Sequence, residues 1–262
     1  MRSSLPSRLI AISFIAALLL TGCSAKDSNN AEAQPSETSS SAAASADASK
    51  DATASSTPAS SEASGSAEAS SSATALPTLA NGQEVTLTDA ERTDFNAGKY
   101  VPATAQHPAL NVPEPVMPEV AKEQTFEGAK AFLEYWVEAN NYAVQTGKNT
   151  MVKQAVSPKW STEQELYDDT RQVYTEGGWF KDGLVKMEIP DEGFNVEANN
   201  SYDVIVYYSE QAGTIYKADG TEEESFSSFN DSRQPTIATL IYENGHWVYE
   251  SSSGIQGVDY EN

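Results

Sequence analysis

Residues 125–147 read TFEGAKAFLEYWVEANNYAVQTG. Thr125 is a suitable helix N-cap, Glu127 favours the first helical turn, and Gly147 is typical of a helix C-terminus. Between these ends, apolar residues recur at helical spacing, at Phe126, Ala129, Leu133, Trp136, Val137 and Val144. The pattern predicts one long helix whose apolar face must be covered by the rest of the domain.

Two shorter helices are predicted after this one. The first follows Asn149 and stops at Ser157-Pro158, because proline disfavours helix at and before its own position. The second starts at Ser161, where Ser161 and Gln164 form a capping-box pattern, and it ends at the Gly177-Gly178 pair.

Beyond Gly178 the apolar pattern alternates, as is typical of strands. Strands are predicted at 185–189, 202–209, 214–217, 225–229, 236–242 and 246–251. Asn244-Gly245 indicates a two-residue hairpin, which places Leu240 opposite Tyr249 and Tyr242 opposite Trp247 on one face. The fold class is therefore α+β: three helices, then an antiparallel sheet of about four to six strands wrapped on the long first helix.

Four short segments also carry a family resemblance. EGAKAFLEYW (127–136), ANNYA (139–143), TGK (146–148) and GGW (177–179) resemble a family of actinobacterial lipoproteins whose C-terminal domain is catalogued as of unknown function, number 6318. The element order is similar to the cystatin-like cone of nuclear-transport-factor-2-like proteins. The resemblance implies this fold from roughly Pro102 to Gln256 and an envelope location, and it implies no activity.

One feature of that family is absent here. Relatives often carry a pair of cysteines near the position of residues 158–161, whereas Cys23 is the single cysteine of this chain. A redox role is therefore not expected.

The segment before the domain, residues 81–124, is rich in proline. Pro102, Pro108, Pro113, Pro115 and Pro118 disfavour both helix and central strand. We therefore expect an extended arm at 81–124, a globular domain at 125–256 and a short tail at 257–262.

The N-terminus has the pattern of a lipoprotein signal peptide. Arg2 and Arg8 precede an apolar stretch from Leu9 to Leu20, which is too short to remain as a membrane span. Leu20-Thr21-Gly22-Cys23 resembles the bacterial lipobox. We expect residues 1–22 to be removed and the secreted chain to be held at the extracytoplasmic face of the cell membrane by lipid, including palmitate, on Cys23.

Residues 23–80 have the composition of a disordered tether. From Ser24 to Ala80 there are 17 Ser and 17 Ala and no aromatic residue, so this segment buries too little apolar area to offset its ordering entropy. A flexible coil of this length spans about 40 Å. Its Ser and Thr content fits either an unmodified spacer or a stalk that carries O-linked sugar.

The charge of the chain excludes one class of partner. The formal net charge is -22, and residues from Asn81 onward account for -19. Nucleic acid binding requires clusters of Lys and Arg, which this chain lacks, so no nucleic acid partner is expected.

No catalytic, metal or cofactor site is predicted. His246 lies beside the hairpin turn opposite Glu243, and His107 precedes Pro108 in the arm. Asp168, Asp169 and Asp203 are the candidates for an inward carboxylate, although solvated positions are favoured for them. Residues 219–224, DGTEEE, form an acidic hairpin turn and lack the earlier oxygen ligands of a calcium loop.

Aromatic side chains are the remaining candidates for ligand contacts. If the fold leaves a cavity, Tyr and Trp at its mouth would hold a small ligand or peptide. The candidates are Tyr135, Trp136, Trp160, Tyr167, Trp179, Tyr207 and Tyr208. We expect non-catalytic binding of a small molecule, peptide or envelope protein. The alternatives are an enzyme of the nuclear-transport-factor-2-like fold with an inward Asp/Tyr pair, and a structural envelope spacer.

Overall fold

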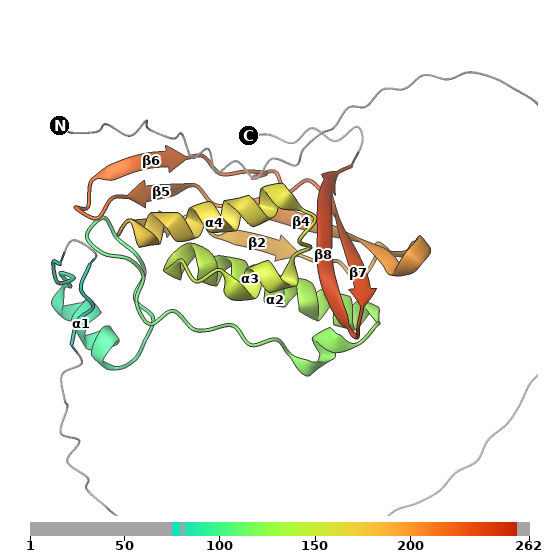
Figure 1. Cartoon of the computed structure of the whole chain (residues 1–262), viewed down its shortest axis with the longest axis horizontal. Coiled ribbons are helices and arrows are strands. Elements are labelled where there is room, and N and C mark those ends of the chain that lie inside the picture. Colours follow the sequence, from blue (N-terminus) through green and yellow to red (C-terminus); the bar gives the residue numbers. More distant parts are fainter. Residues whose placement is uncertain (1–74, 80–81, 256–262) are drawn as a thin grey trace, which may run out of the picture. The chain divides into compact units, whose positions relative to one another are not determined.

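The computed structural model describes residues 75–79 and 82–255. The predicted signal peptide (1–22), Cys23, most of the predicted tether (23–80) and the tail (257–262) lie outside these described residues. The fold is α+β, with helices first and antiparallel strands after them (Figure 1).

Among the described residues, all α-helices precede the strands, and one short 3₁₀ helix lies between β3 and β4. The helical elements are α1 (Asp89–Asn96), η1 (Glu119–Lys122), α2 (Phe126–Thr146), α3 (Thr150–Ala155), α4 (Ser161–Thr175) and the short η2 (Ala198–Asn200). The strands are β1 (Trp179–Asp182), β2 (Val185–Glu188), β3 (Phe194–Val196), β4 (Ser201–Glu210), β5 (Gly213–Tyr216), β6 (Glu222–Phe226), β7 (Thr236–Glu243) and β8 (His246–Gly254).

Helix α2 begins and ends where its sequence predicts. Thr125 Oγ1 accepts a hydrogen bond of 3.0 Å from the Gly128 N–H. At the other end, Gly147 adopts the left-handed conformation with φ 71° and donates its N–H to Ala143. The N-cap bond and the left-handed glycine are the helix ends that the sequence predicts, so the prediction of a long helix over these residues is confirmed.

The start of α4 differs from its prediction. Trp160 is the N-cap and makes no side-chain capping bond, so the predicted capping box at Ser161 and Gln164 is wrong. The Gln164 side-chain amide instead donates to the carbonyls of Val156 at 3.1 Å and Ser157 at 3.3 Å. Gln164 therefore bonds to carbonyls that follow α3 and makes no capping bond of its own helix. These bonds join the end of α3 to α4.

The strands form two antiparallel sheets. The larger has the order β2-β4-β7-β8, with β3 also paired to β4, and the smaller has the order β1-β5-β6. The β7–β8 hairpin has the predicted register, with Glu243 opposite His246 and Tyr242 opposite Trp247. The sequence pattern missed β1 and β3, because four-residue and three-residue strands are too short to show alternation.

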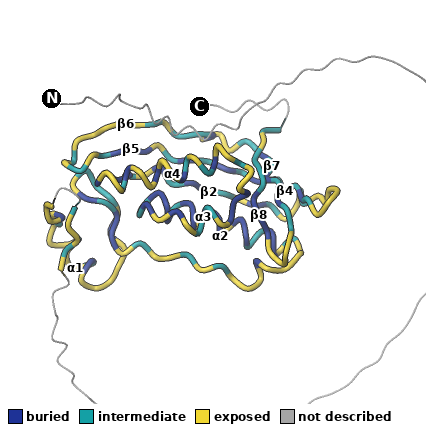
Figure 2. The backbone as a smooth tube through the Cα atoms, viewed as in Figure 1, coloured by how far each residue is buried: buried dark blue, intermediate teal, exposed yellow. Residues whose placement is uncertain are grey.

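The main core lies between α2 and the larger sheet. The rings of Trp136 on α2 and Tyr249 on β8 meet edge to face with centroids 5.0 Å apart. Leu240 and Trp247 are also buried on this face, as the hairpin register predicts. Figure 2 shows that burial is concentrated in α2 and the central strands, whereas β6 is largely exposed.

Asn141 joins α2 to the outer strand of the larger sheet. Its side-chain amide donates to Val185 O at 3.0 Å, and its Oδ1 accepts from the Val185 N–H at 2.9 Å. The helix side chain therefore takes the place of a neighbouring strand at this point of β2.

The segment predicted to be an extended arm is partly folded. Thr88 and Glu91 form a capping box that starts α1, and residues 88–97 contain no proline to oppose a helix. Val85, Phe95, Val101 and Leu110 form a small apolar cluster around this helix. The expectation of an extended chain is met only beyond Val112, up to Pro118.

Several side-chain hydrogen bonds connect this segment to the rest of the domain. Trp179 Nε1 donates to Thr104 O at 2.8 Å, and Tyr100 OH donates to Gln145 Oε1 at 2.6 Å. The segment is therefore an integral part of the domain.

Within the described part of the chain, every helix is too short or too polar to cross a bilayer.

Candidate functional site

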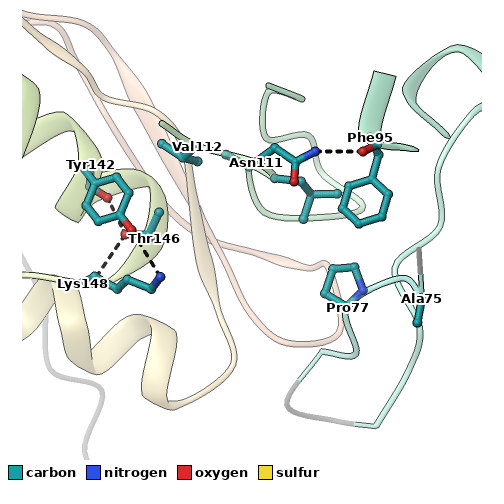
Figure 3. Close-up of a pocket in the computed structure, with 10 residues that line it drawn as sticks. Ala75, Pro77, Phe95, Asn111, Val112, Tyr142, Thr146 and Lys148 are labelled. Atoms are coloured by element: carbon teal, nitrogen blue, oxygen red, sulfur yellow. Dashed lines mark hydrogen bonds between the residues drawn. The ribbon is translucent and has the colours of Figure 1, made fainter. Parts of the chain in front are cut away.

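An open groove of about 370 Å³ lies between the N-terminal segment and the C-terminal end of α2 (Figure 3). We call it the α2-end groove. Its walls consist of residues from both segments: Ala75, Pro77, Phe95, Ala109, Leu110, Asn111, Val112, Tyr142, Thr146 and Lys148.

The α2 wall is built around Tyr142. Thr146 Oγ1 donates to Tyr142 O at 2.6 Å and accepts from the Lys148 N–H at 3.2 Å, which holds the chain as it leaves the helix. Lys148 Nζ donates to Tyr142 OH at 3.2 Å and lies 5.7 Å from the centre of its ring. The ammonium group is thus held beside an aromatic face that favours a cation.

The opposite wall is fixed by Asn111. Its side-chain amide donates to Phe95 O and to Lys99 O, each at 3.0 Å, so that it closes the end of α1. Phe95 and Leu110 are buried beneath this contact and supply the apolar part of the wall. The two walls therefore offer apolar surface on both sides of the groove.

Lys148 gives the groove its charge. It is exposed and forms no ion pair with any carboxylate of the described residues. The chain from Asn81 onward has a formal net charge of -19. An unpaired ammonium group beside apolar walls suits a ligand that has an apolar body and one anionic group.

A second cluster of polar groups lies inside the domain. Tyr167 OH donates to Glu163 Oε1 at 2.6 Å, and Trp136 Nε1 donates to Tyr167 OH at 3.3 Å. Burial raises the pKa of Glu163 to about 7, although the bond from Tyr167 opposes the rise. This carboxyl group therefore exchanges its proton near neutral pH.

Glu210 at the end of β4 belongs to the same cluster. Burial, and then the nearby Glu163, raise the pKa of Glu210 to about 8. Burial also raises the pKa of the Tyr208 hydroxyl, with a further contribution from Glu210. The carboxyl groups of this cluster therefore stay protonated to a higher pH than ordinary glutamates. Among the described residues, the cavity next to the cluster is too small for a substrate.

The aromatic residues predicted as ligand contacts lie elsewhere. Tyr135, Trp136, Tyr167, Trp179 and Tyr208 are buried, and Trp160 and Tyr207 are partly exposed. None of the seven lines the α2-end groove. Trp160 packs its ring against Tyr249 at 5.4 Å, and Trp179 bonds to Thr104. Their positions show that aromatic content in this chain mainly builds the core.

The inward carboxylates are those of Glu163 and Glu210, whereas Asp168 and Asp169 are exposed, as the sequence favours. Asp168 accepts a bond of 2.7 Å from Lys153, which lowers the pKa of Asp168. Asp203 Oδ1 accepts from Thr239 Oγ1 at 2.8 Å. Asp169 is exposed. The Glu163 and Tyr167 pair, four residues apart on one helix, was the overlooked signal.

The two histidines have different surroundings. His246 is exposed beside the hairpin turn, opposite Glu243 as predicted. His107 is buried, with Nδ1 2.8 Å from Pro108 O and Nε2 3.5 Å from Glu91 Oε1. His107 therefore packs the turn between Val101 and Leu110.

The described ranges contain no group of three or more His, Cys, Asp or Glu side chains arranged to hold a metal ion.

Comparison with known proteins identifies one family. The model described as "Family of unknown function (DUF6318)" matches residues 98–253, in agreement with the resemblance of the sequence segments. No curated protein matches the chain. The crystal structure of the intermembrane space region of the chloroplast protein ARC6 is similar, with a TM-score of 0.36 and 12% identity, over 49% of this chain and 95% of that chain. No conclusion about function follows from a similarity of this size.

Proposed function

The chain belongs to DUF6318, a family of unknown function, and from its own residues we propose that it is a lipid-anchored, non-catalytic binding protein of the bacterial cell envelope. In this proposal Cys23 carries the lipid and residues 23–80 are the spacer. The domain then binds a small molecule in the α2-end groove.

The unpaired Lys148 at an apolar groove carries the binding proposal. A volume of about 370 Å³ lies within the usual size of small-molecule sites, roughly 300 to 1,000 Å³. Phe95, Leu110 and Tyr142 would contact the apolar body of the ligand, and Lys148 would pair with its anionic group. The ligand class is therefore a small amphiphile with one negative charge.

The groove lies where the spacer meets the domain. Ala75 and Pro77, which line it, belong to the last residues of the segment 23–80. A ligand bound there would contact the spacer as well as the domain, so binding would order the chain at this junction.

Two probes of equal length test this proposal: octanoate, which is anionic, and octanol, which is neutral. In titrations of the full chain followed by calorimetry, octanoate should bind more tightly than octanol. Lys148→Gln should weaken octanoate binding about five-fold, the size expected for an exposed ion pair, and leave octanol binding unchanged. Lys186→Gln, at an exposed lysine of β2 outside the groove, is the matched control. Equal affinity of wild type and Lys148→Gln for octanoate would refute the proposed role of Lys148.

A second function, an enzyme that uses an inward carboxyl and phenol, has one observation in its favour. Tyr167 and Glu163 form a buried pair at 2.6 Å, and a carboxyl with a pKa of about 7 suits general acid–base chemistry. Turnover of a panel of ester and glycoside substrates that disappears in Glu163→Gln would favour the enzyme. Identical background rates in the two proteins would reject it. A structural spacer predicts that neither octanoate nor octanol binds.

A further inference from the structure

A small, partly enclosed cavity lies between α2, α4 and strands of both sheets, apart from the α2-end groove. Its volume is about 10 Å³, and Asn140, Tyr167, Thr170, Glu210 and Phe226 contribute to its walls. A cavity needs roughly 10 to 15 Å³ to hold one water molecule. Its size therefore limits an occupant to something as small as water.

Asn140 lacks partners in this cavity. The residue is 1% exposed, and neither its Nδ2 nor its Oδ1 has a hydrogen-bond partner among the described residues. A buried amide without partners is rare in folded proteins and costs free energy on both its donor and its acceptor side. The site therefore requires an occupant that both donates and accepts hydrogen bonds.

Glu210 faces the same cavity. The residue is 4% exposed, and it lines the cavity together with Asn140. Thr170 Oγ1 donates to Leu166 O at 2.9 Å, so its lone pairs are available to accept a bond from an occupant. Three polar residues from α2, α4 and β4 thus line one small space.

We propose that this cavity binds a single water molecule, hydrogen-bonded to the Asn140 amide, the Glu210 carboxyl and the Thr170 hydroxyl. Buried waters typically make about three hydrogen bonds to groups that are otherwise unsatisfied. A small cation would use the oxygens of Asn140 and Glu210 but would leave Asn140 Nδ2 without an acceptor. Water satisfies both atoms of the amide.

The water would also border the polar cluster around Glu163. Tyr167 lines the cavity and donates to Glu163 at 2.6 Å. The water therefore lies beside Tyr167, next to the Glu163 and Tyr167 pair on α4.

The direct test is nuclear magnetic resonance of the full chain, through transfer of magnetisation between the Asn140 side-chain amide protons and water. A long-lived internal water gives a cross-peak between the water resonance and these amide protons, and the sign of this cross-peak is that of a water molecule that tumbles with the protein. Its presence is the expected result. Its absence at an assigned Asn140 amide would overturn the proposal.

A variant gives an independent test. If water occupies the site, Asn140→Leu removes the water's partners and lowers the melting temperature of the full chain by at least about 3 °C. If the cavity is dry, the same variant removes two unsatisfied atoms and raises the melting temperature, which would contradict the proposal. Asn195→Leu on the exposed face of β3 is the control and should change the melting temperature by about 1 °C or less. If Asn140→Leu does not fold, the resonance experiment on the wild type still decides.

Discussion

Tyr167 OH donates a hydrogen bond of 2.6 Å to Glu163 Oε1 from one turn further along α4, within the buried part of the domain. The bond favours the ionised carboxylate, yet desolvation is the larger effect and the pKa of Glu163 rises to about 7. Together with Glu210, whose pKa is about 8, this pair makes the stability of the domain depend on pH.

We predict that the free energy of unfolding falls between about pH 5 and pH 8. An unfolded Glu releases its proton near pH 4.5, whereas folded Glu163 and Glu210 keep theirs to about pH 7 and 8. Because the folded state binds more protons in this window, raising the pH favours unfolding, by a total on the order of 6 kcal/mol. Below about pH 4 the slope reverses, since Glu91 and Asp168 have lowered pKa values in the folded state. Urea unfolding curves from pH 3 to 9 should show a maximum near pH 5, and a stability that rises steadily to pH 8 would contradict this prediction.

Glu163→Gln should remove part of that pH dependence. Gln keeps an oxygen that accepts the Tyr167 bond but has no charge to desolvate. The variant should therefore match the wild type at pH 5 and exceed it by about 1 to 3 kcal/mol at pH 8. Glu165→Gln, at an exposed position of the same helix, is the control and should leave the pH profile unchanged. A variant less stable than the wild type at both pH values would argue against desolvation as the cause.

Gly147→Ala should destabilise the domain by more than backbone strain alone. Gly147 has φ 71°, and a Cβ atom there would lie 2.6 Å from Cβ and Cγ of Tyr174. Gly98 has φ 72° with nothing within 4 Å, so Gly98→Ala measures the cost of the left-handed backbone without a clash. We expect Gly147→Ala to lose about 2 kcal/mol more than Gly98→Ala in chemical unfolding. Equal losses would mean that the Tyr174 ring moves aside freely.

Trp179→Phe should loosen the N-terminal segment. The substitution keeps an aromatic ring but removes the 2.8 Å bond from Nε1 to Thr104 O, at a cost of about 1 to 2 kcal/mol. Trypsin should then cleave at the exposed Lys99 faster than in the wild type. Trp160→Phe, which loses no described hydrogen bond to this segment, should leave cleavage at Lys99 unchanged. The prediction is wrong if both variants are cleaved at the wild-type rate.

Cys23→Ser should release the protein from the membrane or leave its signal peptide uncleaved. Serine has a hydroxyl in place of the thiol that would become the nucleophile for lipid attachment. Firm membrane anchoring requires more than one acyl chain, so loss of the lipid should release the protein. Metabolic labelling with palmitate and cell fractionation measure the effect. Ser24→Ala is the control and should remain labelled in the membrane fraction. Normal processing and membrane retention of Cys23→Ser would refute lipid anchoring at Cys23.

The parts of the fold that were predicted correctly depend on local signals. Helix α2 carries its caps and its apolar period within residues 125–147, and Asn244-Gly245 determines the register of β7 with β8. In contrast, β1 pairs with β5, which lies more than thirty residues further along the chain. A short strand whose partner is remote leaves no pattern in its own sequence.

The candidate site was harder to predict for a similar reason. Phe95 and Lys148 are more than fifty residues apart, and they share a groove only because the N-terminal segment packs against the end of α2. Aromatic composition cannot distinguish a side chain in the core from one at a groove, and Trp136 and Trp179, which composition makes candidates for ligand contacts, are buried. The sequence places Lys148 directly after the helix end at Gly147, but only the structure shows that no carboxylate of the described residues pairs with it.

The contact between Asn141 and Val185 also affects how copies of the domain meet. An outer strand normally presents free N–H and C=O groups that a second molecule can extend into a continuous sheet. At Val185 both groups are already bonded to the Asn141 amide. The helix therefore leaves no free backbone hydrogen-bonding group at Val185 for a second molecule to pair with.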